Sequence, residues 1–134
     1  TVLPLAGLHL LLAEDNELNS EIATTLLEEQ GASITAVGNG RLALEAIQNA
    51  APHTYDAILM DVMMPEMNGL EATRCIRAFE GKGPGEGTPI IAMTANVFAD
   101  DVKACLDAGM NSHVGKPLDM KVLIGEILKY ADAR

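Results

Sequence analysis

Five short apolar runs alternate with five segments of helical periodicity along the 134-residue chain. This alternation predicts an α/β fold in which a parallel sheet carries helices on both faces and right-handed crossovers join its strands. We find no internal repeat and no domain boundary, and the chain is long enough for one domain with a hydrophobic core. The segments predicted to be strands are residues 8–13, 33–37, 55–60, 89–93 and 112–115.

Apolar residues recur every three or four positions between the strands, as on the buried face of an amphipathic helix. Asn16 or Asp15 can cap the first helix, and Gly31 ends it. The glycine-rich residues 81–87 lack the spacing of a phosphate-binding loop, so we expect a flexible surface connection there. The apolar stripes are Ile22, Ala23, Leu26 and Leu27; Leu44 and Ile47; Ala72, Cys75, Ile76 and Phe79; Phe98, Val102, Cys105 and Leu106; and Leu123, Ile124, Ile127 and Leu128.

The formal net charge of −10 argues against two classes of partner. The phosphates of nucleic acids and the head groups of anionic membranes both select basic surfaces, so we expect a cation or a partner with a basic face. Aromatic residues make up only 3% of the chain, which disfavours a platform for stacking bases.

No apolar run approaches the length of a membrane span. Cys75 and Cys105 match no metal-ligand spacing, so we expect reduced thiols in a cytoplasmic protein. Residues 1–7 lack a starting methionine and are too short for a signal peptide. We therefore expect residues 1–7 to be a linker remnant in a piece of a longer polypeptide, and residues 8–134 to form the domain.

The apolar run of residues 57–60 stops at Asp61. Pro65 cannot donate a hydrogen bond to a ladder, so this strand must end before it. A strand that is apolar on both faces is buried inside a parallel sheet. Asp61 then lies at the carboxyl edge of a central strand, where open α/β sheets bind their ligands. The alternative is an aspartate that only caps a turn.

Polar residues also follow three other predicted strands. They are Glu14 and Asp15 after the first, Thr94 after the fourth and Lys116 after the fifth. The carboxyl ends of parallel strands share one edge, so these residues should meet Asp61 there. Two like charges about 4 Å apart cost about 4 kcal/mol at a surface-like dielectric, so three carboxylates need a cation or a shared proton. Magnesium, which prefers carboxylates, waters and phosphate oxygens, meets this need.

These residues can together perform phosphoryl transfer. Lys116 can pair with Asp61 at rest and with a phosphoryl oxygen later, and the Thr94 hydroxyl can donate to a second oxygen. A phosphoryl group shielded in this way is open to in-line attack by a carboxylate. This chemistry makes Asp61 a nucleophile and its product an acyl phosphate. Each residue alone is more common as a helix cap, a loop lysine or a solvated turn.

At these positions the chain resembles the receiver domain of two-component response regulators, from about residue 8 to residue 130. It is most similar to the receiver domain attached to a hybrid sensor histidine kinase, as residues 15–19, 69–73 and 92–96 indicate. The stretches that carry the resemblance are residues 11–16 (Leu-Leu-Ala-Glu-Asp-Asn), 60–65 (Met-Asp-Val-Met-Met-Pro), 68–69 (Asn-Gly), 93–95 (Met-Thr-Ala) and 114–117 (Val-Gly-Lys-Pro).

The resemblance implies a flavodoxin-like (βα)5 three-layer sandwich with strand order 2-1-3-4-5. It implies that Asp61 accepts a phosphoryl group from a phosphohistidine of a histidine kinase or a histidine phosphotransfer domain, in a Mg2+-dependent phosphorelay. It also implies a role for each site residue and a cis Lys116–Pro117 peptide. Asp15 and Asp61 would bind the metal directly, Glu14 through water and Met63 through its main-chain carbonyl, while the main chain of Ala95 would contact the phosphoryl group.

The family often carries an aromatic residue three positions before the lysine, and this residue turns inward when the threonine engages the phosphoryl group. His113 stands at that position, so Thr94 and His113 are the candidate switch pair, and a solvent-facing histidine without a role is the alternative. Phosphorylation is expected to shift a two-state equilibrium in the fourth helix and fifth strand.

The resemblance further implies a domain that catalyses its own phosphorylation and slow dephosphorylation. It would contact neither nucleic acid nor membrane and would lie on the cytoplasmic side within a hybrid histidine kinase; a homodimer through the fourth and fifth helices stays open. Two alternatives are weaker. A phosphohydrolase with an aspartyl nucleophile needs a second carboxylate two residues on, where Met63 stands, and a flavin site needs more aromatic residues. A binding module that only keeps the fold would be expected to have lost a site residue.

Overall fold

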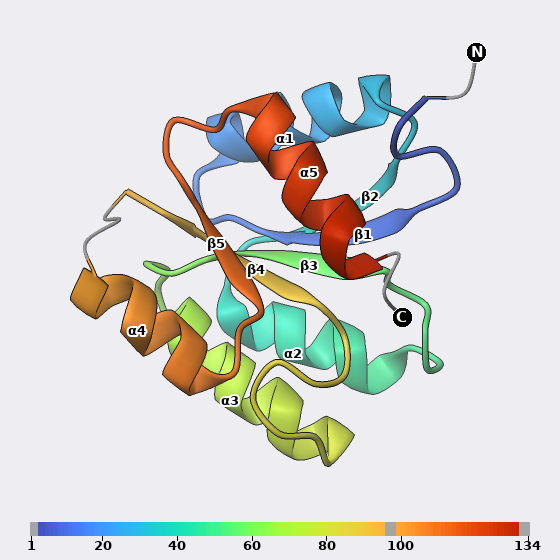
Figure 1. Cartoon of the computed structure of the whole chain (residues 1–134). Coiled ribbons are helices and arrows are strands. Elements are labelled where there is room, and N and C mark those ends of the chain that lie inside the picture. The colour runs from blue at the N-terminus through green and yellow to red at the C-terminus, as the bar shows by residue number, and fades with distance from the viewer. Residues whose placement is uncertain (1–2, 96–98, 132–134) are drawn as a thin grey trace.

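Five strands and five helices alternate along the described part of the chain, which comprises residues 3–95 and 99–131 of the computed structural model. The strands pair in parallel in the order β2-β1-β3-β4-β5, which confirms the predicted sheet (Figure 1). The elements are β1 (His9–Ala13), α1 (Glu17–Glu29), β2 (Ser33–Val37), α2 (Gly40–Asn49), β3 (Ala57–Asp61), α3 (Gly69–Glu80), β4 (Ile90–Thr94), α4 (Ala99–Ala108), β5 (Ser112–Gly115) and α5 (Met120–Ala131).

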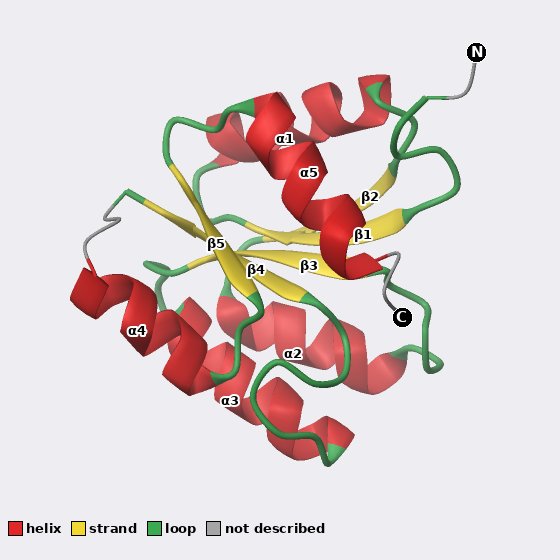
Figure 2. Cartoon of the chain, in the orientation of Figure 1, coloured by secondary structure: helices red, strands yellow, loops and turns green. Residues whose placement is uncertain are grey.

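Helices cover both faces of the sheet, α1 and α5 on one side and α2, α3 and α4 on the other (Figure 2). The central strand β3 shows why. All five of its residues are buried, with Leu59 in the core under α1 and α5, and Ile58 and Met60 in the core under the other helices. Because side chains alternate along a strand, a strand buried in this way must be apolar at successive positions.

Asparagine side chains begin the first three helices. Asn16, Asn39 and Asn68 each accept a hydrogen bond from the backbone N–H three residues on, at 2.9 Å. Such caps satisfy a backbone donor that has no partner within the helix. Of the two candidates for the first helix, Asn16 is therefore the cap, and Asp15 is left exposed next to β1.

Three of the predicted apolar stripes each include an exposed side chain. Ile22 is 50% exposed, Phe79 is 52% exposed and Leu106 is 43% exposed, so these three predictions of burial were wrong. The other described members of these stripes are buried or partly buried. On α3 the fully or nearly buried side chains include Thr73 and Arg77 instead. A Cβ atom on Gly69 would overlap the carbonyl oxygen of Asp61, so the start of α3 lies directly against the end of β3. Phe98, in the fourth stripe, lies outside the described residues.

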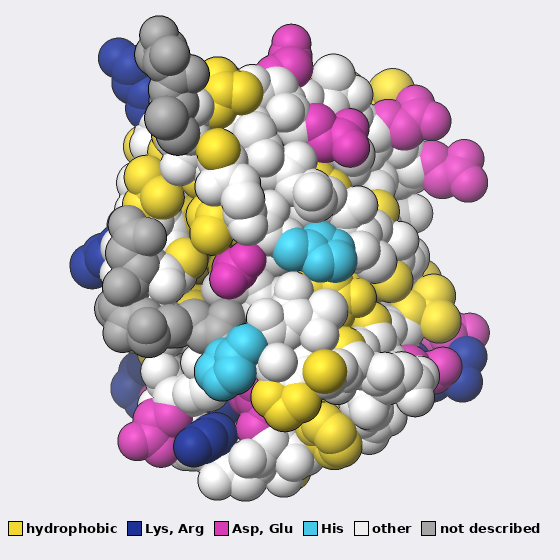
Figure 3. Space-filling view, turned by 90° about the vertical axis from the view of Figure 1, so that its right-hand side faces the viewer, with side chains coloured by type: hydrophobic (Ala, Val, Ile, Leu, Met, Phe, Trp, Pro, Cys, Tyr) yellow, Lys and Arg dark blue, Asp and Glu magenta, His cyan; other side chains and the backbone are white. Residues whose placement is uncertain are grey.

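The two ends of the strands differ in character. Figure 3 shows the amino ends, where histidine, acidic and apolar side chains mix without one kind dominating.

Leu5 lies on this side of β1, in the segment expected to be a linker remnant. It is fully buried in the core under α1 and α5, and its N–H donates to the carbonyl of Gln30 at 2.9 Å. The glycine-rich connection is tied down as well, because the Gly85 N–H donates to the Gly109 carbonyl at 3.0 Å.

Candidate functional site

The register of the sheet brings four strand ends to one level. Ala13 pairs with Met60, so Glu14 follows β1 at the level of Asp61 at the end of β3. Thr94 pairs with Gly115, so Lys116 follows β5 one residue beyond the end of β4. The backbone N–H of Lys116 also donates to the carbonyl of Thr94 at 2.8 Å. Residues that are far apart in the sequence therefore meet at the carboxyl edge, as predicted.

Lys116 bridges two carboxylates at this edge. Its Nζ atom donates to Asp61 Oδ2 at 2.9 Å and to Glu14 Oε2 at 3.3 Å. The side chains of Asp61 and Glu14 are only 7% and 5% exposed, whereas that of Lys116 is 27% exposed. Because these two carboxylates are buried, their attraction to the Lys116 ammonium group is screened less than in an ion pair that is exposed to solvent.

Three carboxylates converge next to this ion pair. One oxygen of each of Glu14, Asp15 and Asp61 lies within 4.8 Å of the others. Glu14 and Asp61 are buried and Asp15 is exposed, so the cluster has an opening to solvent. This donor set fits a hard divalent cation such as Mg2+, which binds one or two carboxylates and keeps several waters.

Burial and charge shift two pKa values at the site. Burial raises the pKa of Glu14 and the Asp61 charge raises it further, although the Asn16 N–H and Lys116 act in the opposite direction. Burial alone would lower the pKa of Lys116, but its hydrogen bonds and ion pairs with Asp61 and Glu14 outweigh burial and raise it. The ammonium group therefore stays charged and compensates the carboxylates.

The other predicted site residues lie around this cluster. Thr94 is 7% exposed at the end of β4, and Ala95 follows it as an exposed residue. The N–H of Met63 donates to Asp61 Oδ1 at 3.3 Å, which folds the start of the next loop back over the aspartate. The Lys116–Pro117 peptide is cis, as predicted.

His113 is separate from this group. It is partly exposed in β5 and pairs with Ala92 in the register of the sheet. Among the described residues, no hydrogen bond or ion pair joins His113 to Asp61 or Lys116. Its part in a switch stays a prediction.

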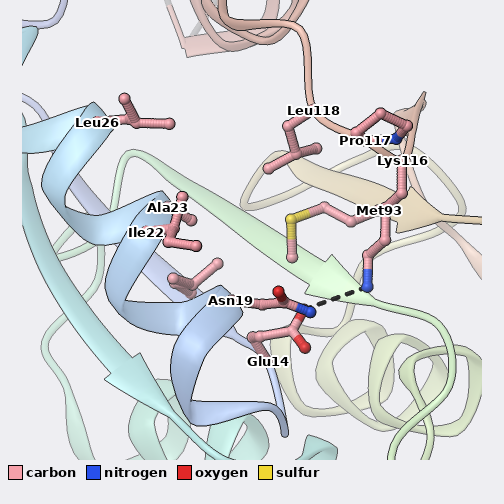
Figure 4. Close-up of a pocket in the computed structure, with 10 residues that line it drawn as sticks. Glu14, Asn19, Ile22, Ala23, Leu26, Met93, Lys116, Pro117 and Leu118 are labelled. Carbon is pink, nitrogen blue, oxygen red and sulfur yellow. Dashed lines mark hydrogen bonds and ion pairs between the residues drawn. The ribbon is translucent and has the colours of Figure 1, made fainter.

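An apolar groove of about 570 Å³ opens beside the ion pair, and the sequence analysis did not anticipate it. Figure 4 shows Ile22, Ala23 and Leu26 of α1 on one side and Pro117 and Leu118 on the other, with Glu14 and Lys116 at one end. The signal in the sequence was the apolar Leu118 directly after the Lys116–Pro117 pair. Ile22, assigned to the core from its spacing, lines this groove instead.

Comparison with known proteins identifies the family. The model of the response regulator receiver domain matches residues 10–128, and the chain belongs to this family. Among curated proteins it is 40% identical to probable histidine kinase 1 of Oryza sativa subsp. indica, over 84% of this chain and 14% of that protein. It is 39% identical to the sensor histidine kinase GacS of Pseudomonas protegens, over 91% of this chain and 13% of that protein. The chain thus spans about one seventh of the length of these relatives.

Solved structures agree with this assignment. The receiver domain of sensor histidine kinase PA1611 from Pseudomonas aeruginosa PAO1, which has a magnesium ion coordinated in its active site cleft, is 37% identical with a TM-score of 0.81, over 95% of this chain and 99% of that one. A further match comes from the co-crystal structure of the histidine phosphotransfer protein Ypd1 and the receiver domain of Ssk1 from Saccharomyces cerevisiae. The identity is 26% and the TM-score 0.82, over 93% of this chain and 89% of the matched chain. In the described parts of this chain, no helix has the length and apolar composition of a membrane span.

Proposed function

We propose that this receiver domain takes a phosphoryl group from a phosphohistidine onto Asp61, with Mg2+ held by the acidic cluster. The observation that carries the proposal is the ion pair of Lys116 with Asp61 at 2.9 Å beside three converging carboxylates. This arrangement holds a nucleophile, a positive charge and a cation site within one small space. The magnesium in the related PA1611 receiver domain supports the choice of metal.

Each residue has a distinct part in the transfer. Asp15 and Asp61 would bind the metal directly, Glu14 through water and Met63 through its main-chain carbonyl. A Mg2+ ion held there would neutralise charge on the phosphoryl oxygens. Lys116 turns from Asp61 to a phosphoryl oxygen, the Thr94 hydroxyl donates to another, and the Ala95 main chain contacts the group as well.

The covalent step exchanges one bond to phosphorus for another. An Asp61 carboxylate oxygen attacks phosphorus in line as the bond to the histidine nitrogen breaks, and that nitrogen keeps the electron pair. The product is an acyl phosphate on Asp61 and a free imidazole on the donor. Water later hydrolyses the acyl phosphate, which restores the Asp61 carboxylate and releases inorganic phosphate. Met63 stands where a phosphohydrolase would need its general acid, so we expect slow turnover.

The phosphoryl group then acts on α4 and β5. Thr94 ends β4, and the hydrogen bond from the Lys116 N–H to the Thr94 carbonyl connects this point to the end of β5. Movement of the Thr94 and Lys116 side chains toward the phosphoryl group biases a two-state equilibrium of these elements. His113 in β5 follows this change as the second member of the switch.

The donor protein docks beside α1. Leu18 and Ile22 are 64% and 50% exposed on this helix, and the apolar groove next to Ile22 ends at Lys116. A helical histidine phosphotransfer domain or histidine kinase fits this surface, and receiver domains pair with such proteins, as in the Ypd1–Ssk1 complex. By this proposal the domain is the cytoplasmic receiver of a hybrid histidine kinase, and it contacts neither nucleic acid nor membrane.

Phosphorylation of the purified domain tests the proposal. Incubation with acetyl phosphate and Mg2+ should add one phosphoryl group, seen by intact-mass spectrometry, and Asp61→Asn should abolish the addition. Removal of Mg2+ by a chelator should also prevent it. Phosphorylation of Asp61→Asn at the wild-type level would rule out the proposal, and rapid turnover of a simple phosphomonoester would favour a phosphohydrolase.

A further inference from the structure

The first turn of α2 lies against the loop of residues 62–68, which follows Asp61. The N–H of Gly40 donates to the carbonyl of Met67 at 3.0 Å. A Cβ atom on Gly40 would overlap that carbonyl oxygen and lie 2.9 Å from the Asn68 carbonyl oxygen. A glycine at this position therefore permits two backbone segments to touch directly.

Asn39 makes a second connection with the same loop. Its Oδ1 atom accepts the hydrogen bond from the Leu42 N–H at 2.9 Å and caps α2, while its Nδ2 atom donates to Glu66 Oε2 at 3.1 Å. Arg41 Nε lies 3.5 Å from the same Glu66 oxygen. One side chain thus both begins a helix and holds a loop.

The backbone of Glu66 is strained. Its φ angle is 64°, in the left-handed region that a residue with a side chain seldom adopts. Such a conformation persists only where the surroundings hold it, and it is commonest at functional sites. Here the Asn39 amide holds the side chain of Glu66, and the Gly40 N–H holds the carbonyl of the next residue, Met67.

The base of the loop is held independently of α2. The Gly69 N–H donates to the Val62 carbonyl at 2.9 Å, and the Val62 N–H donates to the Met93 carbonyl at 3.3 Å. Met63 lies between this base and the segment that α2 holds. The direction of the Met63 carbonyl therefore depends on contacts at both ends of the loop.

We propose that Asn39, together with the Gly40 N–H, is a positioning residue for the metal site, because it holds the loop in the conformation that directs the Met63 carbonyl at the cation. This inference rests on the proposed function, in which Met63 is a metal ligand. Asn39 itself touches neither the metal nor the phosphoryl group. It acts only through the loop.

Substitutions at Asn39 can separate helix capping from loop positioning. Serine and aspartate both cap helices well, so Asn39→Ser and Asn39→Asp should keep α2 and the melting temperature. Aspartate has no donor and repels Glu66, and the serine hydroxyl is one bond closer to the backbone than the Nδ2 atom. Outer residues that orient ligands typically change metal affinity by about 10-fold or more, so we expect Asn39→Asp to weaken Mg2+ binding by about 10-fold and Asn39→Ser by less.

A rescue variant and a direct binding measurement complete the test. In Asn39→Asp/Glu66→Gln the glutamine amide can donate to the new carboxylate, so Mg2+ affinity should return toward wild type, while Glu66→Gln alone should change little. The Kd for Mg2+ is measured by calorimetry, and the amide resonances of residues 63–67 report on the loop. The new carboxylate of Asn39→Asp would itself attract a cation. Weaker Mg2+ binding by this variant would therefore have to arise through the loop.

The outcomes distinguish the two proposals. Wild-type Kd values in both Asn39 variants would overturn the positioning role and leave the proposed function standing. A loss of affinity that merely follows a loss of melting temperature, without rescue, would overturn it as well. Failure of the wild-type domain to bind Mg2+ would overturn the proposed function and this inference together.

Discussion

Lys116 Nζ lies 2.9 Å from Asp61 Oδ2, although the two residues are 55 positions apart in the chain. Lys116 pairs with the carboxylate that is expected to receive the phosphoryl group. It therefore stabilises the site before phosphorylation and is close enough to bind a phosphoryl oxygen afterwards. Its exposed fraction of 27% leaves room for the side chain to turn.

Lys116→Met should slow phosphorylation much more than it destabilises the fold. Loss of one preorganised charge at a site of developing negative charge costs about 100-fold in rate. The three carboxylates lose their compensating cation at the same time, so Mg2+ should bind more tightly in the variant. Phosphorylation rates with acetyl phosphate and Mg2+ titrations check both effects. Lys121→Met on the outside of α5 is the control, and equal rates for the two variants would contradict the prediction.

Glu14→Gln should be more stable than the wild type at neutral pH in the absence of metal. The raised pKa of Glu14 means that the folded state binds this proton more tightly than the unfolded chain, so ionised Glu14 destabilises the fold. The penalty grows as pH rises from 4.5 through the folded pKa and is then constant. Urea unfolding at several pH values should show the advantage of Glu14→Gln shrinking toward pH 4.5. Added Mg2+ should stabilise the wild type more than the variant.

The stability of the wild type at high pH should depend on Lys116. Its pKa is raised from 10.5, because the attraction of Asp61 and Glu14 outweighs the effect of burial. The stabilisation is complete below pH 10.5 and disappears as pH rises through the folded pKa. Unfolding curves of the wild type and Lys116→Met should therefore converge above that pH. A constant difference between them would show that the ion pair is not responsible.

Arg77→Met should destabilise the fold strongly. Arg77 is 4% exposed and donates at 2.8–2.9 Å to Gly109, Thr88, Glu80 and Asn111. Removal of one partner from such a buried charged network costs about 3–5 kcal/mol. Urea unfolding measures the loss, and Arg74→Met on the exposed side of the same helix should cost less than about 0.5 kcal/mol. Similar losses for the two variants would contradict the role of the network.

Leu18→Ala and Ile22→Ala should separate protein donors from small donors. If a phosphotransfer protein docks beside α1, loss of an apolar anchor should slow transfer from that protein by about 10-fold, as for typical interface hot spots. Phosphorylation by acetyl phosphate should stay at the wild-type rate, because both side chains are outside the acidic cluster. Val122→Ala, at a similarly exposed residue of α5, is the control. Equal slowing by all three variants would place docking elsewhere.

The sheet and its carboxyl edge could be predicted from the sequence because each strand ends where apolar residues change abruptly to polar ones. Asp61 illustrates this, since the apolar run before it fixes both its depth in the sheet and its place at the edge. The cis peptide and the roles of individual residues came from the family resemblance instead. The proximity of Glu14, Asp61 and Lys116 followed from the strand topology. The simultaneous hydrogen bonds of Lys116 with both carboxylates did not.

The burial of individual stripe residues was the part that spacing alone could not define. Ile22, Phe79 and Leu106 fit apolar stripes but are exposed, although other members of the same stripes are buried. Arg77 was missed because a charged residue is seldom buried without several partners, and three of its four partners lie 11 to 34 positions away. The contact of α2 with the loop after Asp61 was also invisible, because Asn39-Gly40 looks like an ordinary turn.

The alignment of the strand ends also couples the proposed cation site to complete folding of the sheet. The proposed ligands Glu14 and Asp15 follow β1 and Asp61 ends β3, while the ammonium group of Lys116 follows β5. No fragment shorter than nearly the whole domain therefore contains all of them. An ion that recognises only this assembled edge has little affinity for partly folded chains, and its binding energy is added to the stability of the finished sheet alone. A higher concentration of free magnesium would then lower the fraction of the domain that is unfolded at equilibrium.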